Sequence, residues 1–421
     1  MKTIIPVYLT KKRMFGGLTA LKVLNRDTKI LVFTRAFRSF SAAILTVSFS
    51  IYLSKLGASP VTIGLVFTGI SLFSALRSLL EGMMADRYGR KPILLYTAGL
   101  MVAGGIIFSV TKNLAILMFA AVIFSVGGRL TYTPAEQAML TEKVSSEDRT
   151  MAFSINSFLG TIAAVFGSFA AGLPELLQAW GVPEIASYRP VFMIFAAAGA
   201  TTLIFFMLIE ETIGETSSTY EGEEVEDVAV DERMLLLKWS GVVAMDIIGG
   251  SFIGNFMSYW FYLKFGVGPG KIGTLFGASQ VLAAFSYILG LKMAQRVGTI
   301  RATVLSRIPV VAVNIFTPLM PNYTVVALLR GFMSLFSMID VPLRQSYLMG
   351  ITKSRRRASA AGVVTVASRA TSAGAPIMTG YILQYVSMAL PFYIAASFQL
   401  ASAGLMYLLF KDIRPPEEEN A

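Results

Sequence analysis

The stretch Gly82-Met83-Met84-Ala85-Asp86-Arg87-Tyr88-Gly89-Arg90-Lys91 decides the fold, because long apolar segments flank it on both sides. Three of its residues are basic, and short basic loops of membrane proteins lie on the cytoplasmic side. Gly82 and Gly89 favour a sharp turn or a close approach of two helix ends. Pro92 follows in the first turn of the next apolar segment, where its missing N–H costs nothing. We therefore expect a tight cytoplasmic turn between two membrane-spanning helices.

The composition places most of the chain in lipid. Of its 421 residues, 55% are hydrophobic and only 14% are charged, whereas soluble domains carry about 25% charged residues. The chain has no cysteine, which excludes disulfides and thiolate metal sites, and no histidine. Proton coupling would therefore depend on buried carboxylates.

The formal net charge of +11 suggests nucleic acid at first sight. The basic residues are instead spread over short loops between apolar segments, which is a topology signal. No nucleotide-binding loop, metal-ligand cluster or nucleophile–base pair is evident, so we expect no enzyme, cofactor, metal or nucleic-acid partner.

Twelve apolar segments are each near the roughly 20 residues that a membrane-spanning helix needs. They cover residues 30–53, 60–80, 92–110, 114–133, 151–173, 189–209, 234–263, 269–291, 302–319, 323–347, 358–384 and 389–410. Loop charges place both termini in the cytoplasm: residues 1–29 as a basic lead-in and 411–421 as a tail. Residues 210–233 carry ten acids against one base, which predicts a solvated linker between bundles 30–209 and 234–410.

The two bundles repeat one another in sequence. Pro134-Ala135-Glu136-Gln137 returns as Pro342-Leu343-Arg344-Gln345, and at the same offset Gly167-Ser168-Phe169-Ala170-Ala171-Gly172 returns as Ala375-Pro376-Ile377-Met378-Thr379-Gly380. Two six-helix halves related by an axis along the membrane normal are built from such repeats.

The stretch at Gly82 resembles the signature loop of the major facilitator superfamily, with Gly82, Asp86, Arg87, Gly89, Arg90 and Lys91 at the matching places. The resemblance implies an all-α membrane protein of twelve helices in two pseudo-symmetric bundles. It also gives these residues a gating role. We expect Asp86 to latch the halves together against the start of the eleventh helix, near residues 358–361.

Charged residues inside lipid require a partner or a function. Asp246, Asp340 and Glu136 are the candidate coupling acids. The candidate cavity or substrate residues are Arg38, Arg129, Arg330, Arg369, Gln137 and Gln345. By depth we expect Arg38 to pair with Asp246, and Arg330 or Arg369 with Asp340, either as permanent struts or as switches. Arg77 and Glu81, four residues apart near a span end, are interpreted as a structural pair.

Two helix faces carry polar stripes, which predicts that they face a cavity. Arg129, Thr133 and Glu136 form one in the fourth span. Arg330, Met333, Ser337, Asp340 and Arg344 form the other in the tenth. In the family the first, fourth, seventh and tenth helices line the cavity. Arg330-Gly331 resembles the arginine motif of proton-coupled members, displaced to the repeat partner of the fourth helix.

A helix-packing motif is expected at Gly167, Ser168, Ala171 and Gly172, with Pro376 and Gly380 in the repeat. It resembles the fifth-helix motif of facilitator antiporters, with serine replacing proline and alanine replacing a glycine. Small residues there allow helices to pack closely and pivot.

The sequence therefore predicts a monomeric secondary transporter in the cell membrane, moving a small molecule by alternating access. Proton-coupled export of amphipathic compounds is the leading hypothesis. An organic-anion transporter using buried arginines is the alternative, and a non-transporting receptor or scaffold is a third. Arginines that converge on an empty cavity would favour anions. Arginines consumed by ion pairs, together with an apolar cavity, would favour the exporter, and a solidly packed cavity would favour the scaffold.

Overall fold

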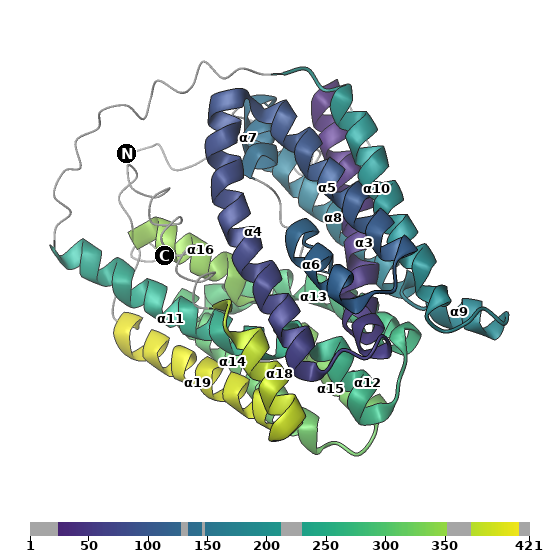
Figure 1. Cartoon of the computed structure of the whole chain (residues 1–421). Coiled ribbons are helices and arrows are strands. Elements are labelled where there is room, and N and C mark those ends of the chain that lie inside the picture. Colours follow the sequence, from purple (N-terminus) through teal and green to yellow (C-terminus); the bar gives the residue numbers. More distant parts are fainter. Residues whose placement is uncertain (1–23, 128–133, 145–147, 212–229, 352–371, 412–421) are drawn as a thin grey trace.

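The computed structural model describes the chain except for residues 1–23, 128–133, 145–147, 212–229, 352–371 and 412–421 (Figure 1). The described residues form α-helices and short 3-10 turns, with no strand among them. This confirms the all-α prediction.

Residues 24–211, the N-half, contain the following elements. They are α3 (Arg26–Lys55), α4 (Pro60–Tyr88), α5 (Arg90–Val110), α6 (Leu114–Phe124), α7 (Pro134–Glu142), α8 (Arg149–Ala170), α9 (Leu173–Ala179), η1 (Ala186–Tyr188) and α10 (Arg189–Met207).

Residues 230–411, the C-half, contain the remaining elements. They are α11 (Val230–Gly254), α12 (Met257–Phe265), α13 (Pro269–Val297), α14 (Thr299–Phe316), η3 (Thr317–Leu319), α15 (Tyr323–Ser334), α16 (Asp340–Ile351), α18 (Ala375–Tyr385) and α19 (Leu390–Phe410).

Short polar residues start several of these helices. The side chain of Asn25 accepts a hydrogen bond from the Thr28 backbone N–H at 2.8 Å, and Ser59 does the same for Thr62 at 3.2 Å. Such caps satisfy N–H groups that have no partner inside the helix.

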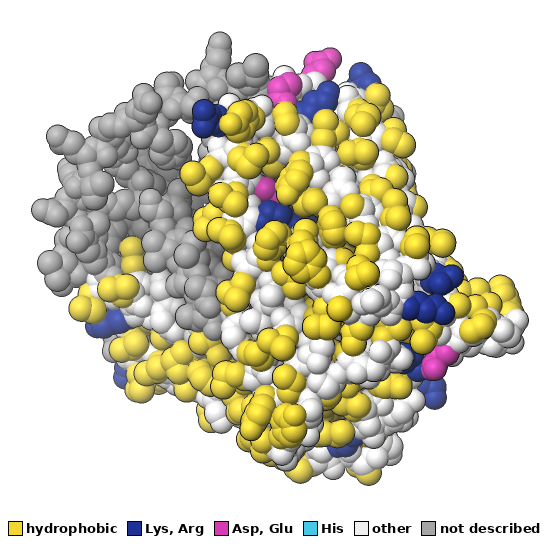
Figure 2. Space-filling view, viewed as in Figure 1, with side chains coloured by type: hydrophobic (Ala, Val, Ile, Leu, Met, Phe, Trp, Pro, Cys, Tyr) yellow, Lys and Arg dark blue, Asp and Glu magenta, His cyan; other side chains and the backbone are white. Residues whose placement is uncertain are grey.

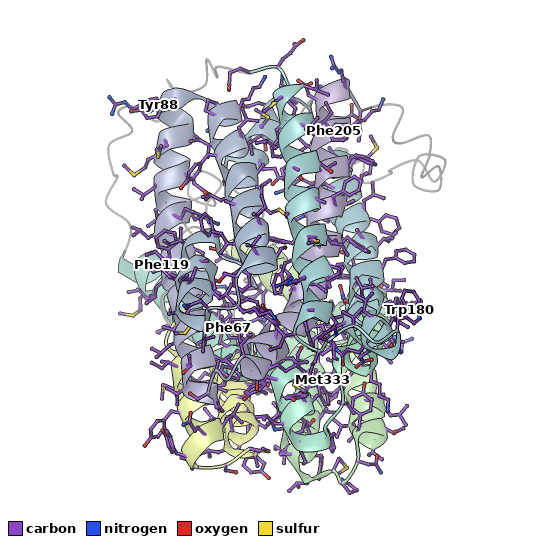
Figure 3. All side chains as sticks on the ribbon, turned by 45° about the vertical axis from the view of Figure 1, so that its right-hand side comes forward. Phe67, Tyr88, Phe119, Trp180, Phe205 and Met333 are labelled. Atoms are coloured by element: carbon purple, nitrogen blue, oxygen red, sulfur yellow. The ribbon has the colours of Figure 1, made fainter. Side chains whose placement is uncertain are left out.

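The surface fits a lipid environment. Nine helices of the described chain are long and apolar enough to cross a membrane, and α6 and α15 are shorter apolar helices. Phe119 is 71% exposed and Trp180 is 80% exposed, and both point away from the bundle (Figure 3). Figure 2 shows apolar side chains along the length of the N-half, with most charges near its ends. The chain is therefore a multi-pass membrane protein.

Three predicted spans are broken rather than continuous, which corrects the expected ranges 114–133, 234–263 and 323–347. The fourth is interrupted after α6, where Ser125 adopts the left-handed conformation with φ 53°. The seventh is interrupted after Gly254, between α11 and α12. Between α15 and α16, Ser334 and Ser337 donate to the carbonyls of Arg330 and Ser334, a local bonding that competes with a regular helix.

The halves meet at one end and diverge toward the other, as the arms of a V (Figure 1). The apex, here called the closed end, is formed by α4 against α18 and by α8 against α13. A Cβ at Gly64 would lie 2.6 Å from the Pro376 carbonyl oxygen, and one at Gly380 would overlap the Pro60 carbonyl. Backbone approach this close requires glycine. The diverging end, here called the linker end, carries the ends of α4 and α10 and the start of α11.

We expect the linker end to be cytoplasmic, on the loop charges alone. Ser187, one obvious site for a topology label, is fully buried. Tyr88 and Trp180, 59% and 80% exposed, lie at different heights of the N-half and suit the purpose better (Figure 3). Single cysteines there, in a chain with none of its own, are expected to react with an impermeant maleimide from opposite sides of the membrane. Reaction from the same side would refute the topology.

Candidate functional site

A cavity of about 520 Å³ lies between the halves. Its lining comes from α3, α4, α5 and α10 on one side and from α11, α14 and α19 on the other. Apolar and uncharged polar side chains alternate over its walls: Phe67, Ile70, Met101 and Phe206, and Ser71, Ser74, Thr202, Ser251, Asn255 and Gln399. Such a lining suits a molecule with both apolar and hydrogen-bonding parts. The open cavity gives no support to the scaffold hypothesis.

Four charged side chains of the C-half meet beside this cavity and are here called the acid–arginine cluster. Asp246 on α11 accepts from Arg307 of α14 at 2.6 Å and from Arg344 of α16 at 2.9 Å. Asp340, at the start of α16, pairs with the same two arginines. Two acids and two arginines make the cluster formally neutral, which is how charges are tolerated at membrane depth.

The two acids differ in their access to the cavity. Asp246 lines it together with Arg307, whereas Asp340 does not, and the side chain of Asp340 is only 1% exposed. In both acids one oxygen, Oδ2, receives both arginines, while Oδ1 has no partner within the described residues. Asp246 is thus the acid of the cluster that borders the cavity.

The predicted pair between Arg38 and Asp246 is wrong. Arg38 pairs instead with Glu136 of α7, inside its own half, and its guanidinium lies 5.7 Å from the centre of the Phe206 ring. Glu136 is fully buried. The break in the fourth span separates α6 from α7, and Glu136 lies in the first turn of α7. Arg38 still lines the cavity, as expected of a cavity residue.

Arg330 does not pair with Asp340. The break between α15 and α16 interrupts the predicted tenth-span stripe, and Asp340 instead meets Arg344 one turn along α16. Arg330 contacts Asn314, Thr317 and the ring of Phe392, and no ion pair among the described residues includes it.

Arg77 and Glu81 are paired at 3.2 Å, as predicted. Their position differs from the expectation of a plain interfacial pair, because both line the cavity and Glu81 is only 4% exposed. The depth arises because α4 extends to Tyr88 instead of ending at residue 80. Every charged residue lining the cavity therefore belongs to an ion pair.

The signature loop is shorter than predicted. Gly82 lies inside α4, with open space where a Cβ would lie, so it does not form the turn, whereas Gly89 does, with φ 95°. Glu211, expected to belong to the solvated linker, accepts from the backbone N–H groups of Arg90 at 2.9 Å and Lys91 at 3.0 Å. Its carboxylate thereby stabilises the N-terminus of α5.

Arg90 and Lys91 also tie the N-half together at the linker end. Arg90 binds Glu142 of α7 at 2.9 Å, and the Lys91 ammonium donates to the Met207 carbonyl at 2.8 Å. The side chain of Asp86 and residues 358–361 lie outside the described part, so the Asp86 latch stays a prediction. Arg87 is exposed.

The packing motif lies at helix contacts, as expected. A Cβ at Gly167 would overlap the Phe40 carbonyl, and one at Gly172 would lie 3.1 Å from Gly270 across the two halves. Ser168 accepts a hydrogen bond from Gln280 at 2.9 Å, also across the halves. Ala171 and Pro376 are buried in the same region.

The other predicted residues do not join the described site. Gln137 is exposed on α7 and does not line the cavity. Arg129, Arg369 and the side chain of Gln345 lie outside the described residues.

Sequence reasoning missed three residues of the site: Arg307, Asn314 and Gln399. Arg307 interrupts an otherwise apolar ninth span, and a charge at that depth was the available signal. The amides of Asn314 and Gln399 carry no such signal, because amides occur in membrane helices for many reasons.

Known proteins share this architecture. The sequence pattern of the Major Facilitator Superfamily matches residues 31–240 and 239–421. An uncharacterized membrane protein of Saccharomyces cerevisiae is 24% identical over 92% of this chain and 95% of its own length. Multidrug resistance protein MdtG of Escherichia fergusonii is 27% identical over 56% of this chain and 55% of its own length.

A solved structure shows the same fold. A bacterial homolog of the human lysosomal transporter Spinster, in an inward-facing and occupied conformation, aligns with a TM-score of 0.73. The alignment covers 91% of this chain and 96% of that chain at 16% identity. The chain is not an enzyme: it belongs to the major facilitator superfamily of membrane transporters.

Proposed function

We propose that this transporter moves amphipathic small molecules, exports them, and couples their movement to protons. The observation that carries the proposal is the acid–arginine cluster at the cavity wall. It joins a carboxylate that borders the cavity to two arginines that a second carboxylate also holds.

Protonation of Asp246 would change this cluster in a definite way. The neutral acid no longer attracts Arg307 and Arg344, so both arginines are left to Asp340 and one positive charge is in excess. A buried excess charge is costly, and movement of α11 relieves that cost. Loss of the proton restores the neutral cluster and returns the protein to its starting state.

The lining supports an amphipathic substrate over an organic anion. Arg38, Arg77 and Arg307 line the cavity, but each is paired with a carboxylate. A substrate anion would have to displace that carboxylate, which leaves a buried charge without its partner. The similarity to MdtG, named a multidrug resistance protein, also favours the exporter.

Alternation between the two sides follows from the V shape. In the described residues the halves contact each other where α4 meets α18, and their linker ends diverge. We infer that the opposite state forms when the halves rock about the cavity.

Proteoliposomes under a pH gradient test the function. We expect purified protein to drive gradient-dependent movement of the lipophilic cation tetraphenylphosphonium, and a proton ionophore to abolish it. The aromatic anion p-aminohippurate, assayed in parallel, is expected not to move. Gradient-driven movement of the anion alone would refute the proposal and establish the alternative.

A further inference from the structure

Arg330 is a partly buried arginine that belongs to no ion pair among the described residues of the C-half, and its surroundings suggest a different role for it. Its Nη1 lies 3.4 Å from the Asn314 side-chain oxygen and 3.4 Å from the Thr317 hydroxyl. The Thr317 hydroxyl donates its own hydrogen to the Val313 carbonyl at 2.7 Å, so toward Arg330 it is an acceptor.

A guanidinium donates hydrogen bonds and never accepts them. The Asn314 atom facing Arg330 must therefore be the amide oxygen, which leaves the Asn314 NH₂ group on the other side. That group donates to the Gln399 side-chain oxygen at 2.9 Å. Because the side-chain oxygen of Gln399 accepts this hydrogen bond, the NH₂ group of Gln399 is the part of its amide that is left to bind something else.

The hydrogen bonds from Arg330 to Asn314 and from Asn314 to Gln399, here called the relay, end at the cavity. It is only 6% exposed and lines the cavity from α19. Its NH₂ group has no partner among the described residues, and it is not among the polar groups that are sealed from solvent. A nearly buried amide whose donor end has no protein partner points to a ligand.

We propose that Arg330 fixes the orientation of Asn314 and so makes Gln399 a hydrogen-bond donor to the transported molecule. Preferred substrates then carry an acceptor without a hydrogen, such as a carbonyl or ether oxygen, next to an apolar body. The inference rests on the proposed function in one respect only, that substrate occupies this cavity. Arg330 is a positioning residue and Gln399 determines specificity.

Replacing the NH₂ group of Asn314 by an oxygen is expected to reverse the donor and acceptor roles along the relay. In Asn314→Asp the new carboxylate accepts from Arg330 and offers only oxygen toward α19. Gln399 then turns its NH₂ group to that carboxylate and its oxygen to the cavity. Because the change also gives Arg330 an ion partner, we expect the variant to fold.

Three tricyclic compounds of nearly one shape test this: 9-fluorenone with an acceptor, carbazole with a donor, and fluorene with neither. Their Kd values are measured by titration calorimetry on purified protein in nanodiscs. We expect wild-type protein to bind fluorenone about fivefold more tightly than fluorene, because one additional hydrogen bond typically changes Kd by about this factor. Asn314→Asp is expected to lose that preference and bind carbazole about fivefold more tightly than fluorene. Gln399→Leu is expected to bind all three alike.

Two further variants test whether Arg330 acts by orienting Asn314 or merely by its positive charge. Arg330→Met is expected to lose the fluorenone preference, since Asn314 is then free to flip. Lys264→Met is the matched control: it removes another cation of the C-half, in contact with Trp260 and outside the cavity lining, and the preference is expected to remain. Equal affinities of wild-type protein for fluorenone and fluorene would overturn the inference, as would a preference that survives Asn314→Asp.

The relay can also be tested without any ligand. Failure of all three compounds to bind would count against the proposed function but would leave this second test open. In protein labelled with ¹⁵N at glutamine, the Gln399 side-chain signal is the one missing from Gln399→Leu. We expect its NH₂ protons to exchange with cavity water in wild-type protein and to be protected in Asn314→Asp. Protection in wild-type protein would refute the relay whatever the compounds do.

Discussion

Replacing Asp246 by asparagine is expected to abolish transport driven by a pH gradient while exchange without a gradient persists. Asparagine has nearly the same shape and still accepts from Arg307, but it cannot carry a proton. In proteoliposomes, gradient-driven movement of tetraphenylphosphonium should fall to the level of empty liposomes. Exchange should remain well above the level of empty liposomes.

Asp27→Asn is the matched control for this variant. Asp27 is also a buried acid in an ion pair, with Lys143 at 2.6 Å, but it does not line the cavity. Its loss should leave pH-driven transport intact. Gradient-driven transport that survives in Asp246→Asn would show that this acid is not the proton carrier, and would favour another coupling ion.

Comparing Asp340→Asn with Asp246→Asn distinguishes an acid that only stabilises the cluster from one that carries the proton. Asp340 holds the same arginines but does not line the cavity. Removing its charge leaves both arginines to Asp246, so one positive charge is in excess on the side of the cluster that does not border the cavity, at a cost of about 3–5 kcal/mol. In Asp246→Asn the same excess borders the cavity. Asp340→Asn should therefore lower thermal stability and impair both transport modes together, unlike Asp246→Asn.

Adding one methyl group at Gly380 is expected to shift the protein out of the observed conformation. A Cβ there would overlap the backbone oxygen of Pro60, which cannot rotate away as a side chain would. Overpacking of this kind costs about 1–3 kcal/mol, which corresponds to a shift of about 5- to 150-fold between two states. Because α18 and α4 belong to different halves, the cost falls on the closed conformation and disfavours it.

Distances between spin labels report this shift directly. Cysteines at Lys112 and Ser387, exposed positions near the closed end of each half, give a pair across the halves in a chain that is otherwise free of cysteine. Gly380→Ala should move the distribution to longer distances and slow transport. Gly404→Ala, on α19 with open space at its Cβ position, should leave the distribution unchanged. An unchanged distribution in Gly380→Ala would contradict the closed end.

The sequence was sufficient for the helical membrane fold because lipid makes the rule simple: apolar segments of sufficient length become helices. Gly89, which turns the chain between α4 and α5, and the small residues at Gly167 and Gly380 were likewise found from their patterns, since close backbone approach needs residues without bulk.

Pairing between charges was harder to predict, because depth along a helix does not tell which neighbour a side chain faces. Arg38 and Asp246 were matched by depth, yet each found a partner within its own half. The breaks at Ser125 and after Ser334 also escaped prediction, because each lies inside an apolar segment long enough to be interpreted as one continuous span. The break at Ser125 shifts the helical phase of α7 and with it Glu136, and the break after Ser334 shifts the phase of α16 and with it Asp340 and Arg344.

The break in the seventh span bears on whether the transporter could open a continuous water path across the membrane. On one side of it α11 carries Asp246, and at the break Gly254 and Asn255 line the cavity. Beyond it α12 stays bound to the closed end: Ser258 donates to the Thr46 carbonyl at 3.3 Å, and Trp260 to the Met388 carbonyl at 2.9 Å.

Because the regular helix is interrupted between these parts, α11 can swing over the cavity without pulling α12 from its contacts. If the halves alternate as proposed, we expect this swing to close over the substrate before either contact at the closed end breaks. Such an occluded intermediate would prevent a continuous water path across the membrane.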